Sequence, residues 1–91
     1  MSQITVQIYS NLREKVGREK VSVDADNVKD ALEELVNELG EKFREQLYEN
    51  GEIKNYYIFL LNGHYLDIER LSQIKLSPGD TLYILPPLAG G

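Results

Sequence analysis

Hydrophobic and polar residues alternate at both ends of this 91-residue chain. Every second residue is apolar within residues 4–9, and the same period returns at Val21 and Val23. A period of two is typical of a strand that is buried on one face. Because a polar stretch containing Gly17 separates the two runs, the pattern predicts a β-hairpin. Thr81–Leu85 alternates in the same way and predicts a final strand.

The next part of the chain has a helical period. Apolar residues follow an i, i+3, i+4, i+7, i+11 pattern over Val28–Leu39, which predicts an amphipathic helix. Asn27 is a suitable N-cap, and Gly40 suits the position just after the helix. The predicted buried stripe comprises Val28, Ala31, Leu32, Leu35 and Leu39. The predicted solvated face comprises Lys29, Glu33, Glu34, Val36, Asn37 and Glu38.

The second half of the chain predicts shorter elements. Residues 41–50 suit a short second helix or a helical loop. Residues 56–61 form the most apolar stretch and predict a strand buried on much of both faces, ended by the turn pair Asn62-Gly63. Tyr65-Leu66 predicts a short edge strand, and residues 77–80 (Ser-Pro-Gly-Asp) predict a type II turn. The order β-β-α-(α)-β-β-β predicts a two-layer α+β fold with one main helix packed on a mixed sheet.

Composition narrows the possible chemistry. The chain has no cysteine and one histidine, His64, so we expect no disulfide, no thiolate nucleophile and no metal site. The net charge is −5, and binding to nucleic acid depends on Lys and Arg, so we expect no nucleic-acid partner. No apolar run approaches the roughly 20 residues of a membrane helix, and the N-terminus does not resemble a signal peptide. We therefore expect a cytoplasmic protein that binds no membrane.

The C-terminus carries the most distinctive sequence. Prolines cannot continue a sheet ladder and favour an extended exit from the domain. We therefore expect a domain over residues 1–85, followed by an extended tail over residues 86–91. The small residues at its tip suit a narrow channel, and its terminal carboxylate becomes reactive once ATP converts it to an acyl-adenylate. The tail residues are Pro86, Pro87, Leu88, Ala89, Gly90 and Gly91.

This tail resembles the ending of the MoaD family, the small subunits of molybdopterin synthase. The segment Leu12-Arg13-Glu14, followed by Val16-Gly17, is similar to the first hairpin of that family. Leu61-Asn62-Gly63 resembles the end of its central strand, and residues 76–82 resemble its turn before the last strand. Residues 41–53 match none of these motifs.

The resemblance implies a ubiquitin-like β-grasp fold in which the first and last strands are adjacent and parallel. It implies that an E1-like enzyme consumes ATP to adenylate Gly91, and that a sulfur donor then converts Gly91 to a thiocarboxylate. The large subunit, a MoaE-like protein, would accept the tail and transfer the sulfur to cyclic pyranopterin monophosphate. The catalytic side chains would belong to that subunit, so we expect this chain to be a carrier without bound cofactor and not an enzyme.

The sequence also predicts a partner-binding surface beside the tail. Six tyrosines without tryptophan suit an interface, because tyrosine combines a large rigid ring with a polar tip. Ordinary sheet packing is the competing interpretation for these residues, and a solvated loop charge is the competing interpretation for Arg13. The predicted binding residues are Tyr9, Arg13, Tyr65, Tyr83, Leu85, Pro86, Pro87, Leu88 and Ala89.

Two other functions fit the same sequence. A ubiquitin-like modifier would use an activated Gly91 to attach itself to lysine side chains. A plain binding module would have a fortuitous Gly90-Gly91 ending. The ThiS branch that feeds thiazole synthesis fits less well, because its members are typically shorter and lack the Pro-Pro exit.

Overall fold

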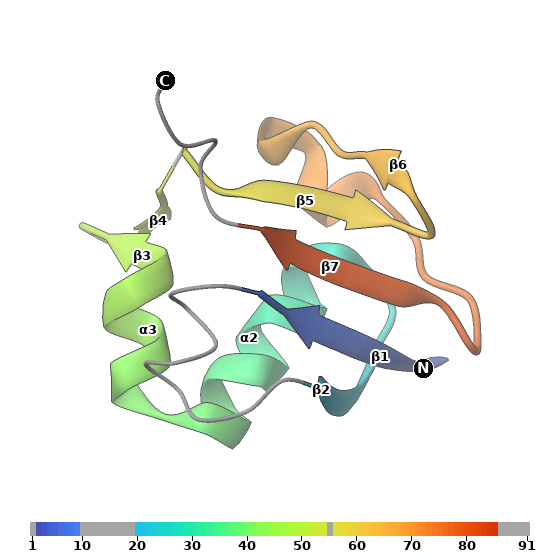
Figure 1. Ribbon diagram of the computed structural model, residues 1–91, viewed down its shortest axis with the longest axis horizontal. Helices are drawn as coiled ribbons and strands as arrows, with labels where there is room; N and C mark the ends of the chain where they lie inside the picture. Colours follow the sequence, from blue (N-terminus) through green and yellow to red (C-terminus); the bar gives the residue numbers. More distant parts are fainter. Residues whose placement is uncertain (1, 10–19, 55, 86–91) are drawn as a thin grey trace.

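The computed structural model describes residues 2–9, 20–54 and 56–85. Figure 1 shows a sheet with two helices behind it and to one side. The elements in chain order are β1 (Ser2–Ile8), β2 (Lys20–Ala25), α2 (Val28–Leu39), α3 (Glu41–Leu47), β3 (Tyr48–Glu49), β4 (Glu52–Ile53), β5 (Ile58–Leu61), β6 (His64–Tyr65), the 3-10 helix η1 (Ile68–Gln73) and β7 (Thr81–Leu85).

The main sheet has five strands in the order β2-β1-β7-β5-β6. β1 pairs with β7 in parallel, and the other three pairings are antiparallel. The expectation that the first and last strands are adjacent and parallel is therefore confirmed. β3 and β4 form a separate two-stranded hairpin.

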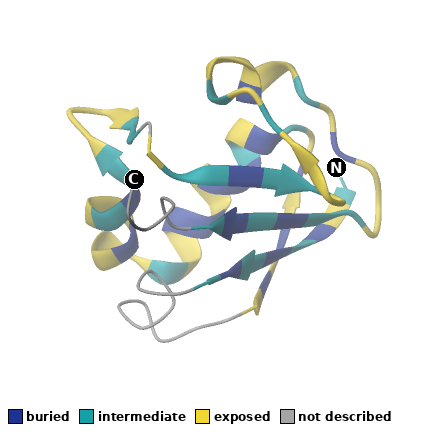
Figure 2. Ribbon diagram, turned by 45° about the horizontal axis from the view of Figure 1, so that its top comes forward, coloured by how far each residue is buried: buried dark blue, intermediate teal, exposed yellow. Residues whose placement is uncertain are grey.

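The core lies between the sheet and α2. On β1 the buried residues are Ile4, Val6 and Ile8, and on β7 they are Leu82 and Ile84. Each strand therefore presents every second side chain to the helix, as its alternating sequence predicts. Figure 2 shows the buried positions repeating along the strands that face the helical layer.

The ends of α2 follow the sequence closely. Asn27 is the N-cap, and its side-chain oxygen accepts a hydrogen bond from the backbone N–H of Asp30 at 2.8 Å. Gly40 follows the helix with φ 90°, and its N–H donates to the carbonyl of Val36 at 2.7 Å. A positive φ of this size favours glycine. Both ends of the helix are thus where the sequence predicts them.

One residue of α2 was placed on the wrong face. Val36 was predicted to be solvated, but it is 6% exposed and belongs to the core. The reason is tertiary, since α3 packs against α2 and the chain then continues into the β3–β4 hairpin. Val36, Arg44 and Tyr48 line a common depression between these elements. The second helix therefore widens the buried stripe of the first.

Residues 41–50 divide into a helix and the beginning of a hairpin. α3 buries Phe43 and Leu47, which are spaced i, i+4 along one face. The predicted short helix is confirmed as far as Leu47, and β3 then starts at Tyr48. Asn50 and Gly51 form the connecting turn to β4, with φ 54° and 81°. Two successive positive φ angles are typical of a type I′ hairpin turn.

The predicted strand over residues 56–61 is shorter and more exposed than expected. β5 covers only Ile58–Leu61, and among its residues only Phe59 is buried. The prediction of burial on both faces was wrong, because helices cover one face of the sheet and leave the other open. The edge strand that was predicted over Tyr65-Leu66 is β6, which begins one residue earlier and covers His64–Tyr65. It follows directly from the turn pair Asn62-Gly63.

A side-chain network joins two turns at the end of the sheet where β7 begins. Asp80 accepts hydrogen bonds from the Asn62 side-chain amide at 2.9 Å and from the Ser77 N–H at 2.8 Å. The Asn62 side-chain oxygen in turn accepts from the Thr81 N–H at 2.9 Å. Gly79 has φ 87°, as the third position of a type II turn requires. The network fixes the start of β7 against the β5–β6 turn.

The surroundings of Tyr48 predict that the stability of the fold depends on pH in the alkaline range. Burial, followed by the charge of Glu33, raises the pKa of its phenol above the usual value of 10.0, although Arg44 opposes the shift. A raised pKa in the folded state means that stability is fully present below pH 10 and is lost as pH rises through the folded pKa. We expect Tyr48→Phe to melt as the wild type does at neutral pH and to lose less above pH 10. Melting curves of both proteins are recorded over this pH range. An equal loss of stability in the two proteins would contradict the prediction.

Candidate functional site

The last described residue, Leu85, lies at the centre of one end of the sheet. It pairs with Ile58 of β5 on one side. On the other side, the backbone N–H of Tyr9 donates to the carbonyl of Ile84 at 3.2 Å. β7 therefore ends between the end of β1 and the beginning of β5 (Figure 1). Residues 86–91 follow in the chain from this point, and we call the surrounding strand ends the base of the predicted tail.

Three strands beside this base carry large side chains on the open face of the sheet. Tyr83 lies opposite Leu60, and Leu60 lies opposite Tyr65. The ring of Tyr9 stacks on that of Tyr83, with centroids 6.2 Å apart and an interplanar angle of 18°. This distance is within the range of favourable aromatic pairs. The open-face patch, as we call it, consists of Tyr9, Ile58, Leu60, Tyr65, Tyr83 and Leu85.

The patch is accessible to a partner. Tyr65 is 79% exposed, and the other five residues are half-buried. Leu82 and Ile84, which alternate with Tyr83 and Leu85, are fully buried. β7 thus directs Leu82 and Ile84 into the core and directs Tyr83 and Leu85, which are also apolar or aromatic, to the open face. A contiguous apolar surface that is partly exposed in this way is a candidate interaction site.

The structure brings together all four predicted binding residues that it describes: Tyr9, Tyr65, Tyr83 and Leu85. Two members of the patch, Ile58 and Leu60, were missed. The sequence feature that could have identified them is the alternation around Phe59. Residues 56–61 were instead predicted to form a strand buried on much of both faces. The other predicted residues lie outside the described residues, and their roles stay predictions. They are Arg13, Pro86, Pro87, Leu88, Ala89, Gly90 and Gly91.

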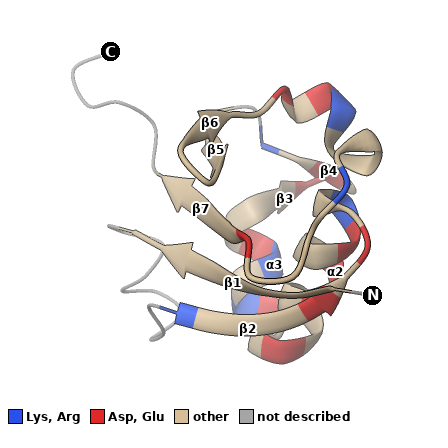
Figure 3. Cartoon of the chain, turned by 90° about the vertical axis from the view of Figure 1, so that its right-hand side faces the viewer, with Lys and Arg blue, Asp and Glu red and all other residues tan. Residues whose placement is uncertain are grey.

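Charged side chains are concentrated elsewhere. Figure 3 shows acidic and basic residues mainly over the helices and their connections, whereas β1, β7 and β5 carry few of them. The described ion pairs are on the surface, as in Lys29–Glu33 at 3.7 Å and Arg70–Asp67 at 3.7 Å. A partner on the open face would therefore be held mainly by apolar and aromatic contacts.

The described residues hold no group of three His, Cys, Asp or Glu side chains arranged to bind a metal ion. His64 is exposed and follows the turn pair that ends β5. Within the same described ranges, no helix is long and apolar enough to cross a membrane.

Comparison with known proteins agrees with this architecture. The sequence matches the ThiS family over residues 6–91. SAMP1 from Haloferax volcanii has a crystal structure that is similar over 99% of this chain and 100% of its own, with 26% identity and a TM-score of 0.85. A search of curated protein sequences found no significant match.

Two further similar structures are of protein complexes. Subunits 1 and 2 of the molybdopterin-converting factor from Helicobacter pylori form a complex that contains one such chain. It has 25% identity, 98% and 99% coverage and a TM-score of 0.66. The BexX/CysO complex of Amycolatopsis orientalis contains another, with 22% identity, 97% and 99% coverage and a TM-score of 0.80, which shows likeness of fold. The β-grasp architecture is confirmed, and with 86 of its 91 residues matched this chain belongs to the ThiS family of ubiquitin-like sulfur carriers.

Proposed function

We propose that this chain carries sulfur on its C-terminus for the synthesis of molybdopterin. An E1-like enzyme joins the Gly91 carboxylate to the AMP portion of ATP and releases pyrophosphate. A donor that supplies sulfur at the hydrosulfide level then displaces AMP and leaves a thiocarboxylate. The large subunit of molybdopterin synthase accepts the tail, and the sulfur passes to cyclic pyranopterin monophosphate. The catalytic side chains belong to that subunit, and this chain binds no cofactor of its own.

The observation that carries the proposal is the place of the Gly90-Gly91 ending in a ThiS-family chain. Six residues separate the end of the central strand β7 from the terminal carboxylate. Fully extended, six residues span at most about 20 Å, which is enough to reach into a neighbouring active site. A protein partner is further supported by the complex of the Helicobacter pylori subunits.

A protein modifier is the second candidate. The small archaeal modifier protein SAMP1 matches this chain with a TM-score of 0.85, whereas the molybdopterin-converting factor subunit matches with 0.66. Both functions require the same adenylated Gly91. They differ in the nucleophile that attacks it, which is a sulfur species for the carrier and a lysine amine for the modifier.

The two functions are separable by mass spectrometry. The chain is incubated with its activating enzyme, ATP and a sulfur donor, and its intact mass is recorded. Replacement of one oxygen by sulfur, followed by loss of that sulfur when the large subunit and the pterin are added, supports the carrier function. Lys75 is the last Lys or Arg of the chain, so trypsin would leave residues 76–91 on any modified lysine. Such remnants on cellular proteins, without pterin sulfuration, would instead establish the modifier.

The open-face patch provides a second prediction for this function. We expect Tyr65→Ala to weaken binding to the activating enzyme or to the large subunit by about 2 kcal/mol, roughly thirtyfold. Its stability should change by less than about 0.5 kcal/mol, since the ring is largely exposed. His64→Ala is the matched control, because His64 precedes Tyr65 on β6, is also exposed and points to the opposite face. Equal affinities for the two variants, measured by calorimetry, would contradict the prediction.

A further inference from the structure

The two edges of the main sheet differ in length. β6 forms one edge with two residues, and β2 forms the other with six. β2 pairs with β1 in an unbroken register from Lys20 to Ala25, without a bulge or a proline. Natural proteins usually shorten, bend or cover such an edge, because its unpaired backbone groups can bind another strand. The six-residue edge of β2 is therefore a candidate site for pairing with another strand.

The direction of the β2 backbone groups follows from the bonds of β1. The N–H groups of Thr5 and Tyr9 donate to β7 and its turn, at 3.0 and 3.2 Å. Because backbone groups alternate in direction along a strand, the alternate residue Val6 bonds on the β2 side. Val6 is paired with Val21 of β2. Val21 and its alternate neighbour Val23 therefore bond to β1.

The alternate residues of β2 direct their backbone outward. Lys20, Ser22 and Asp24 have exposed side chains, and their N–H and C=O groups point to the open edge. Within the described residues, no backbone hydrogen bond beyond the β1–β2 ladder involves these three residues. The edge is closed just after them, because the carbonyl of Asp26 accepts from the N–H of Leu76 at 2.9 Å. The open segment therefore covers residues 20–24.

The charges of this segment are self-complementary. If two copies of β2 pair antiparallel with Ser22 opposite Ser22, Lys20 of each copy faces Asp24 of the other. Opposite charges directly across an antiparallel pair are stabilising. The three outward pairs exchange about six backbone hydrogen bonds, two for each pair. We infer that β2 is the contact strand of a symmetric dimer, in which two sheets join edge to edge through residues 20–24.

This arrangement leaves the functional surface free. Paired residues of an antiparallel ladder point to the same side, so the open faces of both copies lie on one side of the joined sheet. β1 separates β2 from β7, and the open-face patch and the base of the tail remain accessible in each copy. The dimer would thus present two carrier termini on a single surface.

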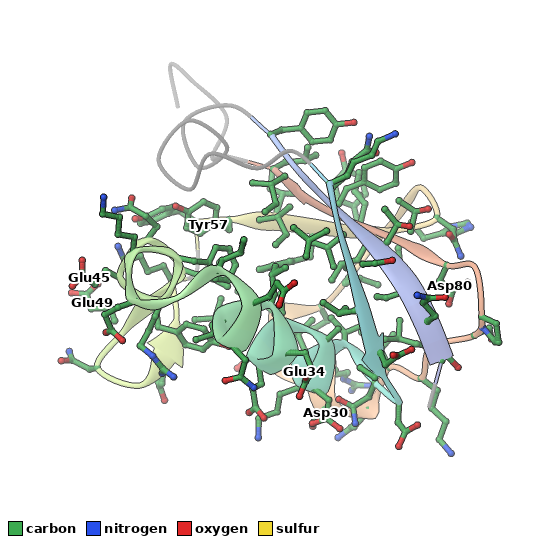
Figure 4. The ribbon with its side chains drawn as sticks, turned by 90° about the horizontal axis from the view of Figure 1, so that it is seen from below. Asp30, Glu34, Glu45, Glu49, Tyr57 and Asp80 are labelled. Carbon is green, nitrogen blue, oxygen red and sulfur yellow. The ribbon has the colours of Figure 1, made fainter. Side chains whose placement is uncertain are left out.

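Acidic side chains limit the strength of the dimer. Lys29 and Glu33 lie on the flank of α2 that faces η1 across a groove. Glu34 lies on a different flank of the helix and is therefore nearer to β2. Figure 4 shows Asp30 and Glu34 on the outer side of α2. These groups and the net charge of −5 repel the second copy. One strand pair also buries less than a standard interface, so we expect a weak dimer at about 0.15 M salt, where only charges within about 8 Å of one another still repel appreciably.

Charge reversal tests the inferred register. Sedimentation equilibrium of the full chain, up to about 1 mM protein, should show a monomer–dimer equilibrium. Lys20→Asp and Asp24→Lys should each weaken the dimer about tenfold, because each places like charges opposite one another at two positions. The double variant Lys20→Asp/Asp24→Lys should regain wild-type affinity. Its net charge equals that of the wild type, so the recovery would not be an effect of total charge.

Two controls complete the test. Glu52→Lys makes the same charge change as Asp24→Lys, but on the exposed β4 strand, and it should not weaken the dimer. Ser22→Pro should abolish the dimer and stay folded, since the N–H that it removes points away from β1. A chain that remains monomeric at 1 mM would overturn the inference, as would a double variant that fails to recover. Slow amide exchange at Ser22 and Asp24 only after addition of a different protein would assign the edge to that protein instead.

Discussion

Removal of Gly91 is expected to abolish sulfur transfer and to leave the melting temperature unchanged. Among the described residues the last member of the buried core is Ile84, and Gly91 has no side chain to bury, so we expect its removal to cost little stability. Transfer, in contrast, requires the terminal carbon at one place in the active site of the partner. An error of about 1 Å in a reacting position costs roughly a hundredfold in rate. One residue of extended chain is about 3.3–3.6 Å, so the shortened tail places its carboxylate out of reach.

The measurement pairs a melting curve with a pterin-sulfuration assay that contains the activating enzyme and the large subunit. Addition of one glycine after Gly91 should also abolish transfer, because it displaces the carboxylate by a similar distance. Gly90→Val should do so by steric exclusion from a channel shaped for glycine. Tyr65→Ala is the informative control, since weakened binding can be overcome with excess partner, whereas an incorrect tail length cannot. Normal transfer by the shortened chain would end the carrier hypothesis.

Leu32→Ala is expected to destabilise the fold by roughly 2–5 kcal/mol. Leu32 is fully buried in α2, where the helix crosses the sheet. Truncation removes apolar contact and leaves a cavity that the close-packed strands can fill only in part. For a domain of this size, each kcal/mol corresponds to about 4–8 °C in melting temperature. Leu35 is buried to the same extent, so Leu35→Ala should behave alike.

Denaturant unfolding measures this effect directly. Glu34→Ala is the matched control because it lies between the two leucines on an exposed position of the same helix. Its change should stay within about 0.5 kcal/mol. Comparable losses for Leu32→Ala and Glu34→Ala would contradict the prediction, because alanine favours the helix at both positions and only Leu32 loses buried contact. Sulfur transfer by Leu32→Ala, assayed well below its melting temperature, should be retained.

The elements with a clear period were predicted from the sequence alone. α2 was predicted with both of its ends, because its apolar stripe, the Asn27 cap and Gly40 agree with one another. β7 was predicted with the same bounds and with Leu82 and Ile84 on one face, which is the buried face. In these segments local sequence and tertiary burial favour the same structure, so a single pattern determines both.

The errors arose where burial depends on a distant segment. Val36 is covered by elements that follow α2 in the chain, so the period of the helix alone assigns it to solvent. Ile58 and Leu60 were missed because a continuous apolar run has two interpretations. It fits a strand that is buried on both faces, and it fits equally well a strand with one apolar face open to a binding partner. The β3–β4 hairpin has only two residues in each strand, too few to establish a period. The adjacency of β1 and β7 was expected from the family resemblance, since no local pattern specifies it.

The central place of β7 also has a consequence for synthesis. β7 lies between β1 and β5, although both of these neighbours precede it in the chain. During translation β1 and β5 are synthesised before β7, so the sheet lacks its middle strand until β7 has been made and its non-local contacts can form. A prematurely terminated chain that lacks β7 therefore lacks the strand that joins the two halves of the sheet. A chain that has completed its sheet has therefore been translated at least to the end of β7 at Leu85.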